Sequence, residues 1–438
     1  MMIEKTIEMA TAGLRAHTIG TDRFKMSRLS FNFILPADRE RSPLTRLMLA
    51  VMMRGCRKYP SVISINKRLD ELYGATVTWR ATAIGRQHVF RISCEMLSNQ
   101  YRLRGDTESI VGSVCDLLLD ILLDPLRDEN GLLSRANFES EKKLAIDAIR
   151  AKINDQKSYA AEQCRELMFE GSPSGISVEG TEEQIEAFTI EQVSENIEYF
   201  LRNAALECYY VGNDDVEQVI ELIGRRFAGL GRERCYLTAS DEALVRPADS
   251  EIREKSEKME VSQSRLNIGY TCDTVMRDVD YYPMCLFNEM FGGSSVAKLF
   301  MNLREKRSLC YYCYSSYHSA TGAIMVGCGI KEKNRQKAFV EIQKQLRNMQ
   351  KGKFSDEELE SAKQTVISGL RQISDSPSAM EAFRFRRILA GVCETEDESI
   401  QRIRDVTRKE IAEAAKKVRL DTVYFLAGAG GGEECENE

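Results

Sequence analysis

Two stretches of the sequence follow the same plan, and this internal repeat constrains the fold more than any other feature of the chain. The first stretch reads F-T-I-E-Q-V-S-E-N-I-E-Y-F-L from Phe188 and is followed by the apolar run C-Y-Y-V-G at 208–212. The second reads V-T-R-K-E-I-A-E-A-A-K-K-V from Val406 and is followed by V-Y-F-L-A-G at 423–428. Each stretch predicts an amphipathic helix followed by a buried strand that ends at glycine.

The starts of these helices also match. Thr189 and Thr407 each stand three residues before a Gln or Glu, which is the pattern of a capping box. A longer helix is predicted upstream of each threonine, beginning near Phe138 in one half and near Phe354 in the other. The spacing to the threonine is 51 residues in the first half and 53 in the second. This agreement indicates two duplicated domains.

The chain length fits this interpretation, because 438 residues suit two domains of about 200 residues each. The stretch 239–260 is dense in Asp, Glu, Arg and Lys and lacks a sustained apolar face. It is therefore expected to be a solvated linker, helical in part. We predict an N-terminal domain at 1–235, a linker at 236–260 and a C-terminal domain at 261–438.

Each half mixes strands with helices. Apolar and polar residues alternate over 77–81 and again over 90–94, on either side of a turn at Gly85. Such alternation predicts an antiparallel hairpin with one buried face, which long amphipathic helices would cover. The fold class is therefore α+β, with two homologous domains that are each a mainly antiparallel sheet covered by helices.

Composition excludes several classes of function. A net charge of −6 gives no basic field for nucleic acid or anionic lipid. The longest apolar run, Leu47–Met53, is too short to span a membrane, and charges interrupt the N-terminal 24 residues throughout, unlike a signal peptide. The 13 cysteines are scattered and odd in number, which fits a reducing compartment. We expect no nucleic acid or membrane partner and a cytoplasmic location.

One C-x-x-C pair occurs, formed by Cys310 and Cys313. The flanking residues predict a strand, on which residues three apart face opposite sides. A redox motif or a zinc knuckle would need a turn there. The two thiols are therefore predicted to be structural.

A helix is predicted from Ser42, its N-cap, with Pro43 in the first turn. One face of this helix is apolar and predicted to lie in the core, and the stripe beside it contains Arg46, Leu49, Ala50 and Met53. After this helix come R-G-C-R-K-Y-P at 54–60 and a second helix ending in L-D-E-L-Y-G at 69–74.

The segment 54–73 resembles the pitrilysin/insulinase family of zinc peptidases, the inverted H-x-x-E-H enzymes. In that family a K-G-T-x-x-Y-P-like turn follows the zinc helix, and a helix ending in L-x-x-x-G-G and a β-hairpin come next. The resemblance implies two half-clamshell domains of the LuxS/peptidase-like type. Aligning Gly55, Tyr59 and Pro60 with the family turn places the five motif positions on 46–50.

By this alignment, each functional position of the zinc motif is substituted. Arg46 stands in place of the first His, and its fixed positive charge would oppose a divalent cation. Leu49 replaces the Glu that acts as general base, and Ala50 replaces the second His. The third family ligand would fall near Asp147 or Ala148, and a lone Asp cannot hold zinc. We therefore expect no metal and no catalytic residue in this chain alone.

The three histidines of the chain, His17, His88 and His318, do not supply a substitute. No two of them lie within four residues of each other, so no helical His pair exists. Each is predicted to be a surface or hydrogen-bonded histidine.

The second half contains F-G-G-S-S at 291–295 and then L-F-M-N-L-R-E-K-R-S-L-C-Y at 299–311. This run resembles the second-domain signature of the same family, a Gly/Ser turn followed by L-R-E-K-x-x-L-x-Y. The resemblance implies that Arg304 and Tyr311 contact substrate and help to stabilise the charged intermediate. The structural alternative is that Arg304 pairs at a helix end and Tyr311 packs in the sheet.

The two halves differ in one respect. Leu72 and Leu309 are 237 residues apart, whereas Phe138 and Phe354 are 216 apart. About twenty extra residues therefore lie in the first half, and we predict that most of them fall in a loop near 124–137.

The leading hypothesis is a non-catalytic subunit of a heterodimeric zinc peptidase. An H-x-x-E-H homologue would supply the zinc, and a peptide or small protein would be the substrate. The alternative is a peptide-binding or scaffold protein with no role in hydrolysis, which could hold an extended peptide at a sheet edge. An independent peptidase of another chemistry is disfavoured, because three isolated histidines cannot form a catalytic cluster.

Overall fold

The computed structural model of the protein describes residues 3–8, 13–232, 241–243, 250–261 and 263–428. The chain forms two compact units, and each is built from parts of both sequence halves. Unit 1 comprises Met1–Arg150, Ile176–Thr238 and Ile373–Arg386. Unit 2 comprises Ala151–Gly175, Ala239–Gln372 and Arg387–Glu438.

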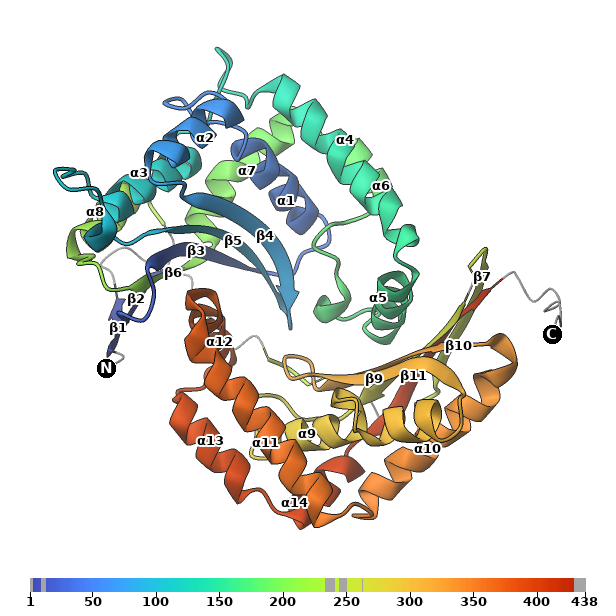
Figure 1. Ribbon diagram of the computed structural model, residues 1–438. Coiled ribbons are helices and arrows are strands. Elements are labelled where there is room, and N and C mark those ends of the chain that lie inside the picture. Colours follow the sequence, from blue (N-terminus) through green and yellow to red (C-terminus); the bar gives the residue numbers. More distant parts are fainter. Residues whose placement is uncertain (1–2, 9–12, 233–240, 244–249, 262, 429–438) are drawn as a thin grey trace, which may run out of the picture. The chain divides into compact units, whose positions relative to one another are not determined.

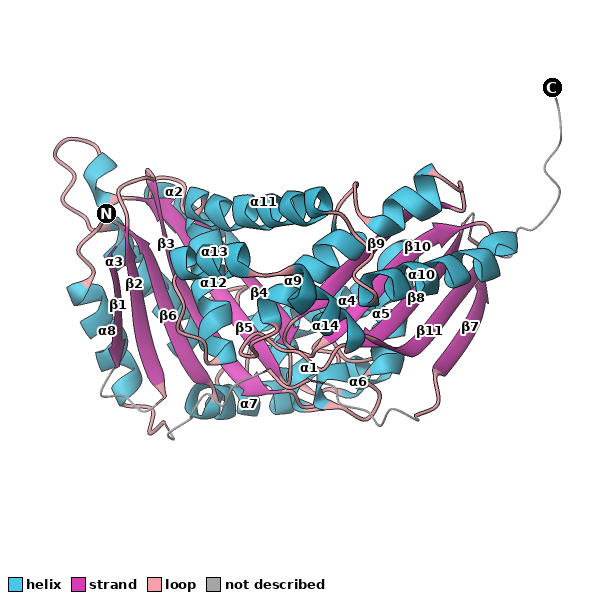
Figure 2. Ribbon diagram, turned by 90° about the horizontal axis from the view of Figure 1, so that it is seen from below, coloured by secondary structure: helices cyan, strands magenta, loops and turns pink. Residues whose placement is uncertain are grey.

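Unit 1 contains a six-stranded sheet in the order β1-β2-β6-β3-β5-β4, whose strands are shown in Figure 2. All neighbours are antiparallel except β2 and β6, which are parallel. The strands are β1 (Ile3–Glu8), β2 (Leu14–Gly20), β3 (Met26–Pro36), β4 (Thr76–Ile84), β5 (Gln87–Leu97) and β6 (Ala205–Gly212).

Unit 2 contains a five-stranded sheet in the order β7-β11-β8-β10-β9. Only β7 and β11 are parallel, so this sheet repeats the order and the pairing directions of the first one without β1. The strands are β7 (Arg253–Met259), β8 (Ser264–Thr271), β9 (Cys310–His318), β10 (Ala323–Ile330) and β11 (Arg419–Gly428). Two mainly antiparallel sheets with helices confirm the predicted α+β class.

The helices fall into two sets along the sequence, and most of them cover one face of a sheet and enclose its main core (Figure 1). In the first half they are α1 (Arg41–Met52), α2 (Val62–Glu71), α3 (Ile110–Leu123), α4 (Arg135–Ala151), α5 (Gln156–Met168), α6 (Glu182–Ala187), α7 (Ile190–Asn203) and α8 (Glu217–Ala228). In the second half they are α9 (Tyr281–Asn288), α10 (Arg335–Gln350), α11 (Asp356–Gln372), α12 (Pro377–Ala390), α13 (Glu396–Asp405) and α14 (Arg408–Lys416).

The two halves of the sequence exchange one helix each. Helix α5 comes from the first half but belongs to unit 2, where Ala160, Cys164 and Met168 pack on the sheet face opposite the main core. The start of α12 comes from the second half but belongs to unit 1, where Met380 packs against Ile19 of β2. The apolar residues of a helix do not by themselves say which sheet the helix covers.

Local signals predicted several element ends correctly. Thr189 and Thr407 are N-caps that form capping boxes with Gln192 and Glu410. Ser42 is not the N-cap of α1, contrary to the prediction, because the helix begins at Arg41. The Asp38 carboxylate instead accepts from the backbone N–H groups of residues 40 and 41, at 2.9 and 2.6 Å.

Part of the predicted linker forms a strand, because β7 at Arg253–Met259 pairs with the edge of β11. Its mostly exposed, charged side chains are typical of an edge strand that is protected from further pairing. Other linker residues, 236–240 and 244–249, lie outside the described residues. The three-part division of the sequence at 235 and 261 stays a prediction.

The extra residues of the first half occupy two connections. Residues 98–109 join β5 to α3, where the second half has only 331–334 between β10 and α10. Residues 124–134 join α3 to α4, against 351–355 between α10 and α11. Counted to Phe138 and Phe354, residues 124–137 exceed their counterparts 351–353 by 11 (14 against 3), whereas the excess before α3 is 8 (12 against 4). The largest single excess therefore lies near 124–137, where it was predicted.

Candidate functional site

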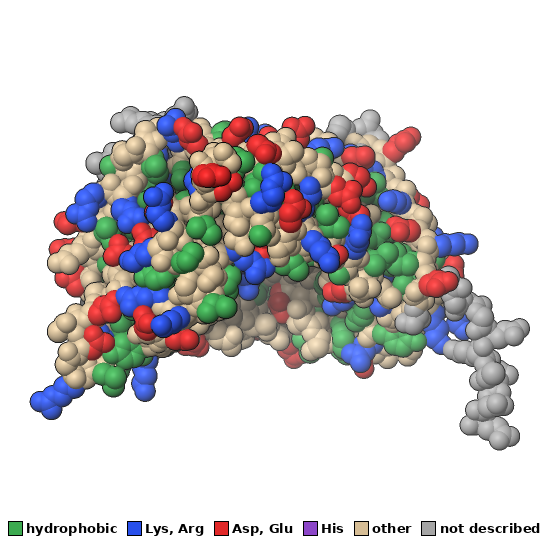
Figure 3. Space-filling view, turned by 90° about the horizontal axis from the view of Figure 1, so that it is seen from above, with side chains coloured by type: hydrophobic (Ala, Val, Ile, Leu, Met, Phe, Trp, Pro, Cys, Tyr) green, Lys and Arg blue, Asp and Glu red, His purple; other side chains and the backbone are tan. Residues whose placement is uncertain are grey.

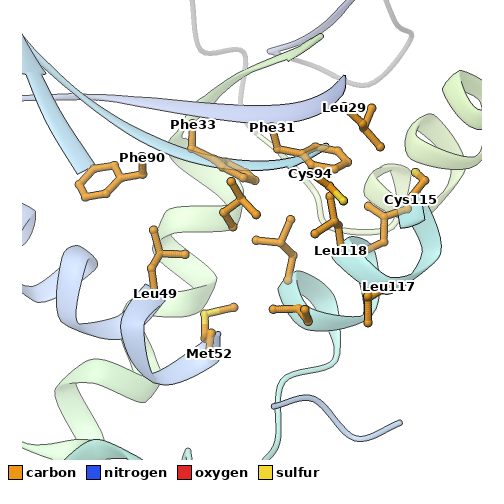
Figure 4. Close-up of a cluster of buried hydrophobic side chains, with 14 of the residues drawn as sticks. Leu29, Phe31, Phe33, Leu49, Met52, Phe90, Cys94, Cys115, Leu117 and Leu118 are labelled. Carbon is orange, nitrogen blue, oxygen red and sulfur yellow. The ribbon is translucent and has the colours of Figure 1, made fainter. Parts of the chain in front are cut away.

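Helix α1 carries the five positions that align with the zinc motif. Leu49 is 1% exposed and lies in the core of unit 1, where Figure 4 shows it among the packed side chains. Ala50 is also buried. The partly buried Arg46 has a guanidinium nitrogen 4.0 Å from a carboxylate oxygen of Glu179. A guanidinium, an isobutyl group and a methyl group offer no metal ligand and no base, so these residues do not fit zinc.

The predicted third position does not change this result. Asp147 is exposed on α4. Among the residues that the structure describes, no three His, Cys, Asp or Glu side chains come together in a group that could hold a metal ion.

The described helices include none long and apolar enough to cross a membrane.

The histidines are surface or hydrogen-bonded groups, as predicted. The buried His17 lies 2.5 Å from a Glu207 carboxylate oxygen and stacks on Tyr209 with ring centroids 4.5 Å apart. His88 is fully buried, and its Nε2 lies 3.1 Å from the carbonyl oxygen of Ile176. His318 is exposed at the end of β9.

The Gly/Ser signature of the second half forms an unusual backbone. Residues Glu289–Gly293 and Phe300–Glu305 are π-helical turns, which often occur at functional sites. A Cβ on Gly292 would lie 2.6 Å from the backbone nitrogen of Ser315 on β9, so only glycine allows this close approach. The signature turn is therefore held against the strand that follows it.

Arg304 lies in the second of these turns with half of its side chain exposed. Its guanidinium is 3.8 Å from the carboxylate of the adjacent Glu305 and 4.8 Å from the ring centroid of Phe300. These contacts are local and open to solvent. Ser308 then takes a φ of +50°, which turns the chain from this segment into β9.

Tyr311 is the extra residue of a β-bulge. On β10, Gly329 pairs with Tyr312 and Ile330 pairs with Cys310, so Tyr311 has no partner in the register. A bulge of this kind redirects side chains and is common beside active sites. Tyr311 is 56% exposed, and its hydroxyl makes no hydrogen bond with any residue that the structure describes.

The same bulge corrects the prediction that the two cysteines of the C-x-x-C pair face opposite sides of the strand. Cys310 and Cys313 are both buried, because the extra residue restores them to one face of β9. The Cys313 sulfur is 2.7 Å from that of Cys328, its partner across the strands. The hydrogen bond from Cys313 and the charge of Arg304 lower the pKa of Cys310, whereas burial holds the pKa of Cys313 well above its usual value.

Sequence reasoning missed a buried polar network in unit 1. Glu381 of α12 is fully buried, and its carboxylate accepts from Arg28 Nε at 2.5 Å and from Ser30 Oγ at 2.7 Å. Asn32 Nδ2 and Arg91 Nε lie 3.4 Å from the same carboxylate. The alternation R-x-S-x-N at 28–32 could have indicated a polar sheet face, but only the fold brings Glu381 to it.

Similarity to known proteins agrees with these features. A family model described as "Peptidase M16 inactive domain" matches residues 187–366. A protein of Bacillus subtilis (strain 168) described as "Probable inactive metalloprotease YmfF" is 29% identical over 421 residues, which cover 96% of this chain and 97% of that protein. Both similarities fit an inactive member of the pitrilysin/insulinase family, in agreement with the substituted zinc motif.

Solved structures support the family fold. The crystal structure of a conserved protein from Enterococcus faecalis V583 matches with a TM-score of 0.89 and 27% identity, over 99% of this chain and 100% of that chain. A peptidase M16 inactive domain from Pseudomonas fluorescens matches with a TM-score of 0.78 and 15% identity, over 98% of this chain and 100% of that chain. The latter likeness concerns the fold alone.

Proposed function

We propose that this chain is the non-catalytic, peptide-binding subunit of a heterodimeric zinc metallopeptidase. A family member with an intact H-x-x-E-H motif would supply zinc and base, and this chain would help to enclose the substrate. Arg304 and Tyr311 would contact the substrate or its charged intermediate. Because the proposed partner carries the metal, this chain needs none of its own.

The observation that carries the proposal is the exposure of Arg304 and Tyr311. A structural tyrosine of a sheet is normally packed, and a structural arginine at a helix end normally holds a strong ion pair. Tyr311 instead stands at a bulge, and within the described part of the chain its hydroxyl has no hydrogen-bond partner and the Arg304 guanidinium pairs with Glu305 and lies over Phe300. Both side chains are thus available to a ligand, with donors suited to a developing oxyanion.

The remaining expectations belong to this proposal. The substrate would be a peptide or small protein. The scattered cysteines favour the cytoplasm, where thiols stay reduced. The 11 cysteines that the structure describes are all free thiols.

The test mixes the purified chain with an H-x-x-E-H homologue from the same organism and measures cleavage of a peptide panel. The mixture should cleave peptides when zinc is present, and the chain alone should not. Arg304→Gln and Tyr311→Phe should each lower kcat of the mixture by about 10²-fold, as the loss of an oxyanion donor does. Lys306→Gln is the matched control, because Lys306 is exposed in the same segment.

Two results would contradict the proposal. Full turnover by the partner alone would show that it needs no second subunit. Unchanged kcat and KM in both variants would remove Arg304 and Tyr311 from the site. Tight peptide binding by the mixture without cleavage would favour the scaffold alternative.

A further inference from the structure

A polar grid covers one face of the unit 1 sheet at its β4 edge. Across β3, β5 and β4, the register aligns three rows of residues. The rows are Arg28–Glu95–Thr76, Ser30–Ser93–Thr78 and Asn32–Arg91–Arg80. A cavity of about 320 Å³ lies over this grid, within the size range of ligand pockets.

Three arginines line this cavity, and their positions leave a positive charge uncompensated. Arg80 stands directly opposite Arg91 across the strands, an arrangement of like charges that destabilises a sheet. Arg28 lines the cavity as well. Burial lowers the pKa of Arg91, Glu381 acts to raise it, and the charges of Arg28 and Arg80 lower it further.

The carboxylates nearby balance only two of the three guanidinium groups. Glu381 is engaged by Arg28 and lies beside Arg91, and Glu95 pairs with Arg28 at 3.0 Å. Arg80 is exposed, and no described residue forms a hydrogen bond or ion pair with it. Its guanidinium therefore has donors available to a ligand in the cavity.

We propose that this cavity binds a single carboxylate of a peptide, with Arg80 as the principal contact. A guanidinium binds a carboxylate through two parallel, charge-assisted hydrogen bonds. The hydroxyl oxygens of Thr78 and Ser93 lie 3.0 Å apart, so one hydroxyl donates to the other and one O–H group is left to donate to a ligand. Ser378 places the first turn of α12 at the same cavity. One negative charge balances the site, whereas a phosphate dianion would exceed it and face Glu95.

This site lies in unit 1 and does not depend on the proposed role in hydrolysis, so the chain is tested without a partner. Calorimetry at low salt measures binding of the blocked peptide acetyl-Ala-Glu-Ala-amide. The same peptide with Gln in place of Glu should bind at least about tenfold more weakly, because it lacks the charge. Arg80→Gln should weaken binding of the Glu peptide by a similar factor.

Arg104→Gln is the matched control, since Arg104 is exposed in unit 1 but does not line the cavity, and it should leave binding unchanged. Emission from Trp79, the only tryptophan, checks that β4 stays folded in each variant. Equal affinity for the Glu and Gln peptides, or equal affinity of wild type and Arg80→Gln, would overturn the proposal. Arg80-dependent binding of inorganic phosphate that is tighter than that of the Glu peptide would overturn the carboxylate assignment. Absence of binding to either probe would overturn the site.

Discussion

Removal of the Glu381 carboxylate should destabilise unit 1 strongly. The side chain is fully buried and holds the guanidinium of Arg28, whose side chain is only 9% exposed. Glu381→Ala leaves the charge of Arg28 buried with only the half-exposed Glu95 as a partner, and Arg91 loses its nearest carboxylate. Breaking a buried ion pair in this way costs about 3–5 kcal/mol.

Smaller changes at the same site should cost less. Glu381→Gln keeps an oxygen that can accept from Ser30 but loses the charge-assisted bonds, which are worth about 1.5–3 kcal/mol. The pair of changes Glu381→Leu and Arg28→Met should destabilise less than the sum of the single changes, because no buried charge is then left without its partner.

The assay is urea unfolding followed by the fluorescence of Trp79. This residue is the only tryptophan of the chain and packs against the unit 1 core, so its signal reports unit 1. Asp375→Ala is the matched control: Asp375 lies in the same exchanged segment but forms an exposed ion pair with Arg23 at 3.3 Å. That pair should contribute about 0–1 kcal/mol. The reasoning is refuted if Glu381→Ala costs no more than Asp375→Ala.

Three further predictions concern the candidate site around Arg304 and Tyr311 and the substituted zinc motif on α1. Gly292→Ala should lower the thermal stability of unit 2 by about 1–3 kcal/mol, since the new Cβ would collide with the Ser315 backbone nitrogen at 2.6 Å; an unchanged melting temperature would contradict the close approach. Leu49→Glu should restore no peptidase activity. The variant should also lose stability as pH rises above about 4.3, because burial raises the pKa of the new carboxyl group and the core tolerates only its protonated form. Denaturation of the Leu49→Glu variant at pH 4 and at pH 7 tests this prediction, and greater stability at pH 7 would contradict it. Iodoacetamide should alkylate Cys310 near neutral pH faster in wild type than in Arg304→Gln, because the charge of Arg304 helps to lower the pKa of Cys310. Equal alkylation rates, measured by mass spectrometry, would show that the guanidinium does not act on this thiol.

Local chemistry made part of the fold predictable from sequence. The capping boxes at Thr189 and Thr407 involve residues three apart, so the sequence contains the whole signal. The hairpin of β4 and β5 follows from alternation and one turn at Gly85. The class of each domain could be predicted because such signals recur in both halves.

Features that depend on a distant partner could not be predicted. The bulge at Tyr311 is a property of the pairing between β9 and β10, and a shift of one residue reverses every side chain beyond it. This is why Cys310 and Cys313 share a face. The exchange of α5 and α12 is likewise invisible in sequence, since an apolar helix face does not specify which sheet it covers.

The positions aligned with the zinc motif and the proposed contact residues Arg304 and Tyr311 differ in what folding requires of them. Leu49 and Ala50 are part of the unit 1 core, and full burial of a leucine side chain is worth about 1.5–3 kcal/mol, so stability alone accounts for an aliphatic residue at position 49. Arg304 and Tyr311 are exposed, and substitutions of such surface residues usually change stability by only about 0.5 kcal/mol. Packing therefore explains Leu49 and Ala50 but leaves Arg304 and Tyr311 unexplained. A ligand-binding role explains an exposed guanidinium and an exposed phenol at a β-bulge, and this contrast supports the proposed division of labour between two chains.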